Sequence, residues 1–537
     1  MSLPKDRGQG SLFSAGWLAQ GLFGVGSRYR VFQEKVLPVL RRAGKHLDRL
    51  YCEDNGRPAI EPVVMAGVTV LQYLERAPDA EAVERVRYHL GWKYGLELPL
   101  DYKGFHPTSL VTFRQRLLEG EEERRVFDAV VEGLGEAGLV KKRMKQRLDS
   151  THVLGCVSQM SRLQVVRETI RVMLEEMDAQ GVGEGFEEWE RYVERYGESE
   201  VDWRSQGAEQ LKEKFREAGE DALRLLKWVR AAGEAVRGSD GATLLERVFL
   251  EQYELGDGGV GRREKEGSGT VKNPHDGEAQ WAAKDTEGKT AWVGYKAQVR
   301  ETVRDEGTPK AKGEPTDQFL TDVTTTEAIA SDIAGMHRSL AATPEDRPRA
   351  LHTDASYVSD DTLAEAKAQG WELVGPARPS PEREGVIRSE EFDVNTAERR
   401  AVCPAGKTST QCSLIHEAQA QKQYYRFEWG AHCDGCPRQK ECTRSKRGRR
   451  TLVVGVHHDL LQARRREMKT EAFQERMRQR NGIEGTIHEL TWYGLRRTRY
   501  RGLAKTRLAN YFIGAACNIN RWIRLTIWQA EQALAAA

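Results

Sequence analysis

The order of strands and helices in the second half of the chain is the feature that most constrains its fold. Two segments with the β-branched and aromatic composition of strands, Thr290–Val303 and Phe319–Ala328, are followed after a helix by a third, Arg349–Val358. A helix at Ser359–Ala368 and a further strand at 370–377 come next. This β…βαβ order predicts an α/β fold, with a mixed sheet and flanking helices.

Apolar residues at helical spacing predict an all-α N-terminal domain at residues 1–145. The pattern recurs in four segments, Ala59–Arg76, Ala80–Leu90, Phe105–Leu117 and Val126–Leu139. Residues 146–537 contain the predicted sheet, and they begin with a short predicted strand that carries Asp149 at or near its end. We therefore expect two domains, of which the second holds the sheet.

Two segments interrupt the predicted α/β domain. Residues 156–270 consist mainly of amphipathic helices and predict a helical insertion. The glycine-rich stretch Gly256–Gly269 closes this insertion, and we interpret it as a solvated linker because no predicted strand precedes it, as a phosphate loop would require. Residues 380–450 interrupt the domain a second time with a cysteine-rich insertion.

Charge is distributed unevenly along the 537 residues. The formal net charge is only +2, yet the chain from Thr443 to its end has 20 Lys and Arg against 7 Asp and Glu. Such asymmetry indicates a local surface for a polyanion on an otherwise acidic body. The alternative is a set of solvated helix faces, but those mix both signs more evenly.

The C-terminal region combines cations with one acidic side chain on a predicted helix. Arg480 and Glu484 are four residues apart, so they would share a helix face, where the arginine could hold the carboxylate. The cations that we expect to bind DNA phosphate are Arg480, Arg496, Arg497, Arg499, Arg501 and Lys505. Trp492 and Tyr500 could stack on an unpaired base, while some of the cations could instead pair with acids of the body.

Three acidic residues are the candidate catalytic groups. Asp149 and Asp354 lie at or near predicted strand ends, where open α/β sheets place their chemistry, and Glu484 could be added by a helix packed on the sheet. Converging carboxylates repel one another, and divalent cations with oxygen preference neutralise them. Taken singly, each aspartate could equally cap a helix or form a turn. The histidines nearby, His152 and His352, are expected to make structural hydrogen bonds.

The same segments resemble a known family of enzymes. FHPTSLVTFRQRL resembles the end of the InsH-type N-terminal domain of DDE transposases of bacterial insertion sequences. LDST and HTDASYVSDDTL resemble the segments with the first and second acidic residues, and RNGIEGT…GLRRTRYRGLAKTRLANYFIGAACNINR resembles the segment with the third. The resemblance implies an RNase-H-like catalytic domain in which Asp149, Asp354 and Glu484 bind Mg²⁺ or Mn²⁺.

The resemblance implies that the chain is a transposase that acts on DNA phosphodiesters. Its partners would be the terminal inverted repeats of its element and target DNA, and it would form a homo-oligomer. It would be a cytoplasmic bacterial protein, associated with the nucleoid when active. The sequence agrees with this location, because no apolar run approaches the about 18–20 residues that span a membrane and the N-terminus lacks a secretory pattern.

Two positions depart from the family's pattern around the third acid. Met477 replaces the expected tyrosine, and Thr491 replaces the lysine expected seven residues after the glutamate. Two alternatives therefore stay open: a metal-dependent nuclease of the same fold, and a catalytically inactive, transposase-derived DNA-binding protein. Retention of all three acids favours the enzymes.

A cluster of cysteines predicts a second metal site. Cys433, Cys436 and Cys442 form a C-x2-C-x5-C pattern, and Cys403 supplies a fourth thiol upstream. Four sulfurs with one tight pair suit structural Zn²⁺, and an iron–sulfur cluster is the less favoured alternative. The fourth ligand is unsettled because Cys412, His416 and His432 compete for it, and a loop with unligated cysteines is the plainer interpretation.

Overall fold

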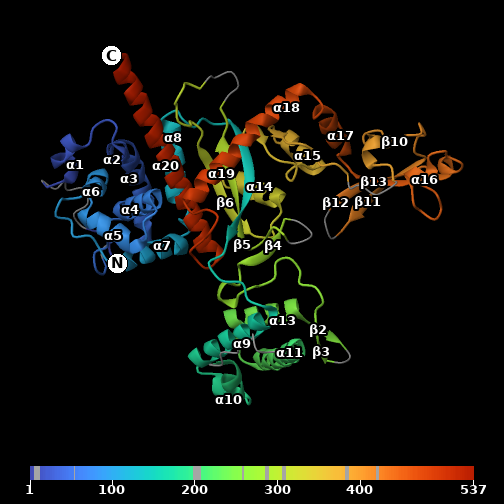
Figure 1. The fold of residues 1–537 in the computed structure, drawn as a ribbon, viewed down its shortest axis with the longest axis horizontal. Coiled ribbons are helices and arrows are strands. Elements are labelled where there is room, and N and C mark those ends of the chain that lie inside the picture. Colours follow the sequence, from blue (N-terminus) through green and yellow to red (C-terminus); the bar gives the residue numbers. More distant parts are fainter. Residues whose placement is uncertain are drawn as a thin grey trace.

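The computed structural model describes residues 1–4, 13–53, 55–197, 207–256, 259–284, 289–304, 310–380, 386–418 and 422–537. A central sheet has the N-terminal helices on one side, a helical module projecting from one end, and a cysteine-rich module at the far side (Figure 1). This architecture confirms the predicted fold class, an α/β fold with a mixed sheet, flanking helices and a helical N-terminal region. The predicted domain boundaries stay a prediction.

The central sheet has six strands in the order β4-β5-β1-β7-β8, with β6 also paired to β5. Their bounds are β1 Lys145–Leu154, β4 Gln280–Ala283, β5 Ala291–Thr302, β6 Leu320–Glu327, β7 Ala350–His352 and β8 Glu372–Val374. The β1–β5, β4–β5 and β5–β6 pairs are antiparallel, whereas β1–β7 and β7–β8 are parallel. The mixed sheet is therefore built around the long strands β1 and β5.

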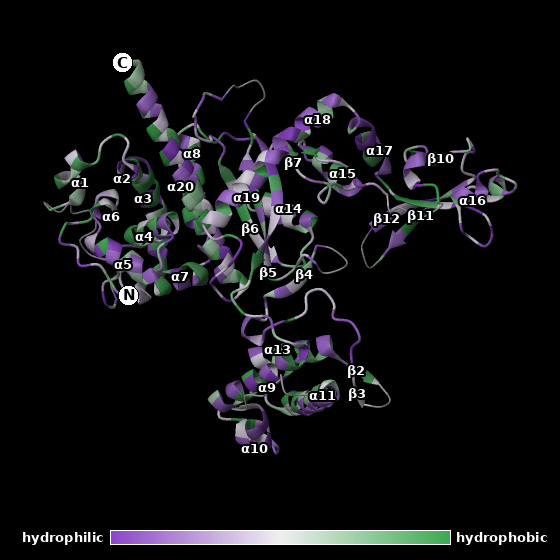
Figure 2. Ribbon diagram, in the orientation of Figure 1, coloured by the Kyte–Doolittle hydropathy of each residue, from purple (hydrophilic) through white to green (hydrophobic). Residues whose placement is uncertain are grey.

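Long helices pack on the sheet and join it to the N-terminal region. They are α14 Asp332–Ala341, α15 Asp360–Ala368, α17 His458–Glu467, α18 Glu471–Arg478, α19 Gly482–Trp492 and α20 Leu503–Ala536. Helix α20 contacts β6 on one side and α4 and α8 of the N-terminal region on the other. Figure 2 shows that α17 and α18 are largely hydrophilic, in keeping with their exposed positions. Among the described residues, no helix is long and apolar enough to cross a membrane.

The N-terminal region is helical, as predicted. Its helices are α1 Ala15–Leu18, α2 Arg28–Val31, α3 Leu37–Leu47, α4 Pro62–Glu75, α5 Asp79–Tyr88, α6 Leu90–Gly95, α7 Thr108–Glu119 and α8 Arg125–Glu136. Tyr73 and Phe127 of this region pack against Phe512 and Tyr511 of α20, with ring centroids 5.6 and 6.1 Å apart. One hydrophobic core thus runs from the N-terminal helices through α20 into the sheet.

The helical module has a hydrophobic core of its own. It consists of α9 Arg162–Ala179, α10 Trp189–Tyr192, α11 Ala208–Ala231, α12 Glu234–Arg237 and α13 Asp240–Gln252. The linker predicted at Gly256–Gly269 is wrong in its first part, because β2 Tyr253–Gly256 and β3 Gly259–Arg262 pair as an antiparallel hairpin. The hairpin forms because Tyr253 anchors it: its ring stacks on Phe215 and its hydroxyl donates to the Phe215 carbonyl at 2.6 Å.

The cysteine-rich module is formed by two small sheets and a short helix. Its elements are β9 Asp393–Asn395, β10 Arg400–Val402, β11 Gln411–Glu417, β12 Lys422–Glu428, β13 Thr451–Gly455 and α16 Gln439–Cys442. Apolar side chains that include Phe392, Phe427 and Trp429 form its core, and Cys403, Cys433 and Cys442 pack against them. These cysteines therefore lie against the apolar core of the module.

Three details of the predicted elements differ from the structure. The strand with Asp149 is ten residues long and Asp149 lies in its middle, because antiparallel pairing with β5 continues to Leu154. Strand β7 ends at His352, so Asp354 lies in the turn beyond it. Helix α15 begins at Asp360, one residue after the predicted start, because Ser359 is its N-cap and accepts the Thr362 amide with its hydroxyl.

A buried ion cluster around Glu301 of β5 links the sheet to two helices. The Glu301 carboxylate is fully buried and pairs with Arg147 of β1 at 2.6 Å and with Arg521 of α20 at 2.9 Å. Thr486 of α19 donates its hydroxyl to the same carboxylate at 2.8 Å. Because α19 is held at this point, the cluster fixes where that helix begins relative to β1.

Replacing Glu301 by alanine should destabilise the fold by about 3–5 kcal/mol, because buried Arg147 would lose its carboxylate partner and Arg521 would keep Glu489 but lose Glu301. The free energy of unfolding from urea denaturation measures this loss. Arg30→Ala is the matched control, since it breaks the exposed Arg30–Glu34 pair and should cost much less stability than the loss of Glu301. Equal losses in the two variants would contradict the role assigned to the cluster.

Candidate functional site

Parallel pairing of β1 with β7 brings two of the candidate carboxylates together. The last paired residues are Arg147 and His352, and Asp149 and Asp354 each lie two residues beyond them. The two aspartates therefore occupy equivalent positions on neighbouring strands. Burial raises the pKa of Asp149, and the charge of Asp354 raises it further, while Arg480 acts to lower it. Each aspartate thus lies within electrostatic range of the other.

Backbone amides orient the two carboxylates. The Ser150 amide donates to Asp149 Oδ1 at 2.7 Å, and the Ser356 amide donates to Asp354 Oδ1 at the same distance. The Ser356 hydroxyl lies 2.5 Å from the same Asp354 oxygen. In each aspartate, hydrogen bonds occupy Oδ1 and leave Oδ2 for another partner, which for Asp149 is Arg480.

A third aspartate, Asp332 at the start of α14, bridges the serines beside the candidate pair. The Ser150 hydroxyl donates to Asp332 Oδ1 at 3.0 Å, and Lys296 Nζ lies 3.4 Å from that oxygen. Burial acts to raise the pKa of Asp332, but Lys296 and the Ser356 and Ser150 hydroxyls lower it overall. Asp332 is thus held as an anion between strand β1, which carries Asp149, and the turn that carries Asp354.

Sequence reasoning missed Asp332 and its partners. Its position directly after Ser331 matches the first turn of a helix, and Ser331 does accept the Ala334 amide as an N-cap at 3.1 Å. That signal identifies the start of a helix. It carries no information about the contact of Asp332 with Ser150, which lies 182 residues earlier in the chain. Only the assembled sheet reveals the contact.

Glu484 lies in the first turn of α19, and its side chain is exposed. The expected pairing of Arg480 with Glu484 on one helix is not what the structure has: Arg480 belongs to a 3₁₀ turn, Gln479–Asn481, and donates to Asp149 Oδ2 at 2.8 Å. Arg147 holds this turn by donating to the Gln479 carbonyl at 2.8 Å. As the side chains lie, no three His, Cys, Asp or Glu residues of the described chain form a group able to hold a metal ion.

The basic segment after α19 runs beside the end of β1. Leu154 of β1 donates its amide to the Arg496 carbonyl at 2.8 Å, and Arg496 Nε lies 3.2 Å from the Thr151 hydroxyl. The side chains that face solvent are Arg496, Arg497, Arg499, Arg501 and Lys505. Five of the six cations expected to bind DNA therefore lie on the surface, two of them, Arg496 and Arg497, beside the end of β1, and Arg480 lies partly buried at the candidate site.

The two aromatic residues expected to stack on a base differ in environment. Trp492 is 66% exposed, and the Arg76 guanidinium lies 4.7 Å from its ring centroid. Tyr500 instead packs toward the N-terminal helices, where its hydroxyl lies 3.4 Å from that of Tyr73 and Arg114 lies over its ring. Of the pair, Trp492 is the ring that an incoming base could reach.

Both histidines near the aspartates, His352 and His152, lie in surroundings that favour the neutral ring. Both ring nitrogens of His352 are buried without a hydrogen-bond partner, so the hydrogen bond expected for it is wrong, and burial lowers its pKa to about 4. Burial also lowers the pKa of His152, and the nearby Arg496 and Lys284 lower it further. Both rings are therefore neutral near pH 7.

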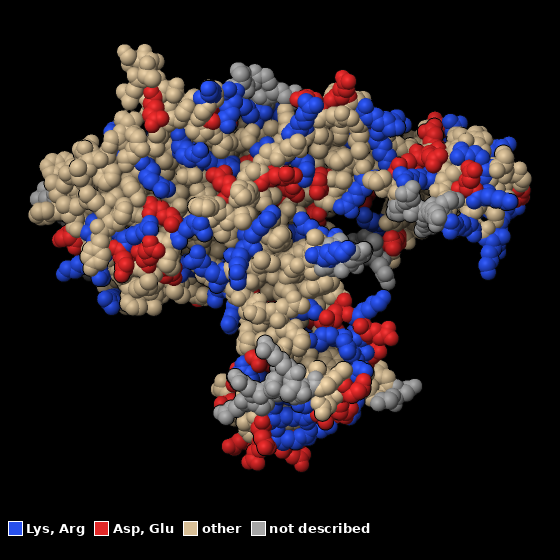
Figure 3. All heavy atoms as spheres, in the orientation of Figure 1, with Lys and Arg blue, Asp and Glu red and all other residues tan. Residues whose placement is uncertain are grey.

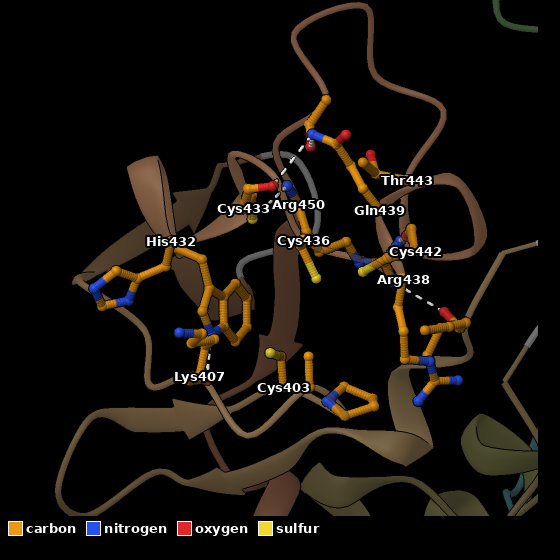
Figure 4. A pocket seen from close by; sticks show the side chains of 15 residues that line it. Cys403, Lys407, His432, Cys433, Cys436, Arg438, Gln439, Cys442, Thr443 and Arg450 are labelled. Carbon is orange, nitrogen blue, oxygen red and sulfur yellow. Dashed lines mark hydrogen bonds between the residues drawn. The ribbon is translucent and has the colours of Figure 1, made fainter.

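Four cysteines line one cavity in the cysteine-rich module. Figure 4 shows the sulfurs of Cys403, Cys436 and Cys442 turned toward a common space, with the His432 ring directed away from it. Burial raises the pKa of the Cys442 thiol, and Cys433, Cys403 and Cys436 raise it further through their charge. Of the competing ligands, Cys412 and His416 lie on β11, outside the residues that line the cavity.

Two family models match the chain. One, described as a transposase DDE domain, matches residues 402–523, and the other, described as a transposase domain (DUF772), matches residues 26–116. The first match includes Glu484, the cysteines and the basic segment, and the second covers most of the N-terminal helices. Comparison with curated proteins and with solved structures found no match.

Replacing Asp332 by alanine should weaken Mn²⁺ binding about 10- to 100-fold, the usual effect of losing a group that orients metal ligands. Electron paramagnetic resonance of free and bound Mn²⁺ measures the dissociation constant, and Asp332→Asn should recover part of the affinity because it keeps one acceptor. The matched control is Asp361→Ala, which removes an exposed carboxylate paired with Lys422. Unchanged affinity in the Asp332 variants would rule out this orienting role.

Proposed function

We propose that this chain, whose two family matches support a DDE transposase of the insertion-sequence type, binds the terminal inverted repeats of its element and catalyses metal-dependent DNA strand cleavage and transfer. The observation that carries the proposal is that Asp149 of β1 and Asp354, in the turn after β7, each lie two residues beyond the last pair of these strands. Two carboxylates held near each other beside neighbouring inner strands of a mixed sheet, with exposed cations near the end of β1, suit phosphodiester chemistry.

The donor set fits a hard divalent cation. Asp149, Asp354 and Glu484 supply carboxylate oxygens, the ligands that Mg²⁺ and Mn²⁺ prefer. When bound, such ions activate the attacking oxygen and stabilise the departing one. Since Glu484 is exposed at the start of a helix, its carboxylate would join the aspartates as their charge is neutralised.

Arg480 would control access to Asp149. Its guanidinium bonds Asp149 Oδ2 at 2.8 Å, the oxygen that no backbone amide occupies, and so neutralises part of the charge at the site. Ligation of a cation through this oxygen requires the guanidinium to move away, after which it could contact the DNA backbone. The arginine thereby exchanges a carboxylate for a phosphate as its partner.

The reaction itself would be a displacement at phosphorus. Water, or the 3′-hydroxyl of a cut end, attacks the phosphodiester; a new phosphorus–oxygen bond forms and the bond to the departing 3′-oxygen breaks. Asp149, Asp354 and Glu484 would hold the divalent cations beside the reacting oxygens, and Arg496, Arg497 and Lys505 would position the duplex through its phosphates. Trp492 offers an exposed face on which an unpaired base can stack.

The partners that follow from this proposal are two kinds of DNA and a second copy of the chain. Terminal repeats would be read by the N-terminal helices, whose core is continuous with α20 and the sheet. Target DNA would enter at the carboxylates. Bringing two ends of an element together requires at least two active sites, so we expect a homo-oligomer on DNA.

The departures at Met477 and Thr491 do not conflict with the local packing. Met477 packs on an apolar cluster that includes Phe473, Ala350 and Val374, below the edge of the sheet. The Thr491 hydroxyl donates to the Ile487 carbonyl within α19 at 2.8 Å. Because both residues make ordinary packing or hydrogen-bond contacts, neither departure distinguishes a transposase from a nuclease or an inactive DNA-binding protein. Measurements of DNA cleavage and joining make that distinction.

Cleavage of a duplex that bears the element's terminal repeat, with Mg²⁺ present, should fall about 10³-fold or more in Glu484→Gln, because a lost metal ligand costs several kcal/mol in the transition state. The duplex affinity should be unchanged. Glu475→Gln, on the exposed face of α18, is the matched control and should cleave normally. A wild-type chain that binds the repeat and never cuts it would favour the inactive DNA-binding protein.

Joining separates a transposase from a nuclease of the same fold. A pre-cut repeat end with a 3′-hydroxyl, incubated with supercoiled plasmid and Mg²⁺, should become covalently attached to the plasmid. Gel analysis of labelled ends detects the product. Efficient cutting with no joined product would support the nuclease.

A further inference from the structure

We propose that the basic loop 443–450 of the cysteine-rich module is a second surface for duplex DNA, and that a zinc ion held by the four cysteines fixes its shape. Here "basic loop" means this segment between α16 and β13. The inference goes beyond the proposed function, since it concerns DNA backbone held away from the carboxylates. Three observations support it: the positive charge of the basic loop, the attachment of the loop to the cysteines, and the four thiols that line the cavity.

The loop and the helix before it are strongly cationic. From Arg438 to Arg450 there are seven Lys and Arg and one acidic residue, Glu441. The exposed cations are Lys440, Arg444, Lys446, Arg447 and Arg449. Arg449 pairs with Asp434 at 2.9 Å, and Arg438 with Glu441 at 3.4 Å, so these two charges are partly compensated within the module. Figure 3 shows Lys and Arg side chains projecting from this end of the molecule.

Both ends of the basic loop are attached to the cysteine cluster. Its start follows Cys442 directly, and at its end Arg450 donates its backbone amide to Cys433 Sγ at 3.5 Å. Arg450 also donates its guanidinium to the Cys442 carbonyl at 3.0 Å, which closes the loop. Gln439 ties the middle by donating to the carbonyls of Gly448 and Cys433. The position of the loop therefore follows the arrangement of the cysteines.

The cavity suits a zinc ion by its donors. Four thiols line it, and an amide that donates to Cys433 Sγ stabilises the negative charge of a thiolate. Zinc binds as a tetrahedral thiolate complex, and closed four-sulfur sites are structural. The sulfurs do not yet form a metal-holding group as the side chains lie, so binding would draw them inward and tighten both ends of the basic loop.

Duplex DNA is the occupant that the composition of the loop favours. Its sequence, TRSKRGRR, contains cations, hydroxyls and one glycine and has no apolar side chain. Protein partners are held chiefly by buried aromatic and apolar anchors, and membrane surfaces by inserted apolar residues, which the loop lacks. Phosphate contacts need only Lys, Arg and hydroxyl donors, which the loop supplies.

The test measures DNA affinity as a function of salt, without Mg²⁺, so that cleavage does not enter. The full chain, loaded with zinc, is titrated against a fluorescent 30-base-pair duplex of random sequence. The loop variant, Lys440→Ala/Lys446→Ala/Arg447→Ala, removes two cations of the loop and one of the adjoining helix α16, and it should bind at least about tenfold more weakly at 0.1 M salt. The slope of log K against log salt should fall by about 2.7, or about 0.9 for each phosphate that the variant no longer neutralises.

A charge-matched control separates a local contact from net charge. Lys212→Ala/Lys227→Ala/Arg237→Ala removes three exposed cations from the helical module and should leave the slope unchanged. Equal effects of the two triple variants, or no effect of the first, would overturn the DNA-binding role of the loop. Because Glu484→Gln keeps the loop, it should bind this duplex normally whether or not the proposed cleavage activity exists.

A second experiment measures the zinc content of the chain and the effect of zinc on the slope of log K against log salt. Mass spectrometry of metals should find one zinc per chain, and removing it with a chelator should lower the slope as the loop variant does, with recovery when zinc is returned. Cys436→Ser should lose the zinc. The central sheet and its helices should remain folded, as judged by their unfolding transition. A chain without zinc, or a chelated chain with an unchanged slope, would overturn the metal-dependent part of the inference.

Discussion

The buried Glu301 carboxylate is the interaction on which the geometry of the candidate site depends. It joins β5 to Arg147 of β1, to Thr486 of α19 and to Arg521 of α20. Arg147 lies two residues before Asp149, and Thr486 lies two residues after Glu484. Removing Glu301 would leave Arg147 buried without its carboxylate partner and Arg521 with Glu489, at a cost of several kcal/mol. The cluster therefore holds the strand of the first acid and the helix of the third in one arrangement.

The three candidate acids differ in how firmly they are held. Asp149 and Asp354 are fixed by the β1–β7 ladder, by the amides of Ser150 and Ser356, and through these serines by Asp332. Glu484 lies exposed in the first turn of α19, where side-chain rotation is unhindered. A pair of fixed carboxylates with a movable third suits a site that closes as cation and DNA bind, since repulsion among the three disfavours closure beforehand.

Sequence patterns predicted what depends on local periodicity. Helices α4, α5, α7 and α8 and strands β5 and β6 were found within a few residues, because their apolar side chains recur at the spacing that burial requires. Contacts between distant segments were not predictable: Arg480 bonds Asp149 across 331 residues, in place of the expected Glu484 four residues away. The hairpin at Tyr253 was missed because its anchor, Phe215, lies in another element. The motifs name the candidate acids Asp149, Asp354 and Glu484, which stay a prediction, and they carry no information about Asp332, which lies beside two of them.

The most direct test of the account is the location of Mn²⁺ in a crystal of the chain bound to its terminal-repeat duplex. Anomalous scattering at the manganese edge should give density in contact with Asp149 and Asp354, with Glu484 turned inward to join them and Arg480 released from Asp149. Manganese density elsewhere, or an Arg480–Asp149 pair that persists in the DNA complex, would contradict the claim that these three acids form the catalytic centre.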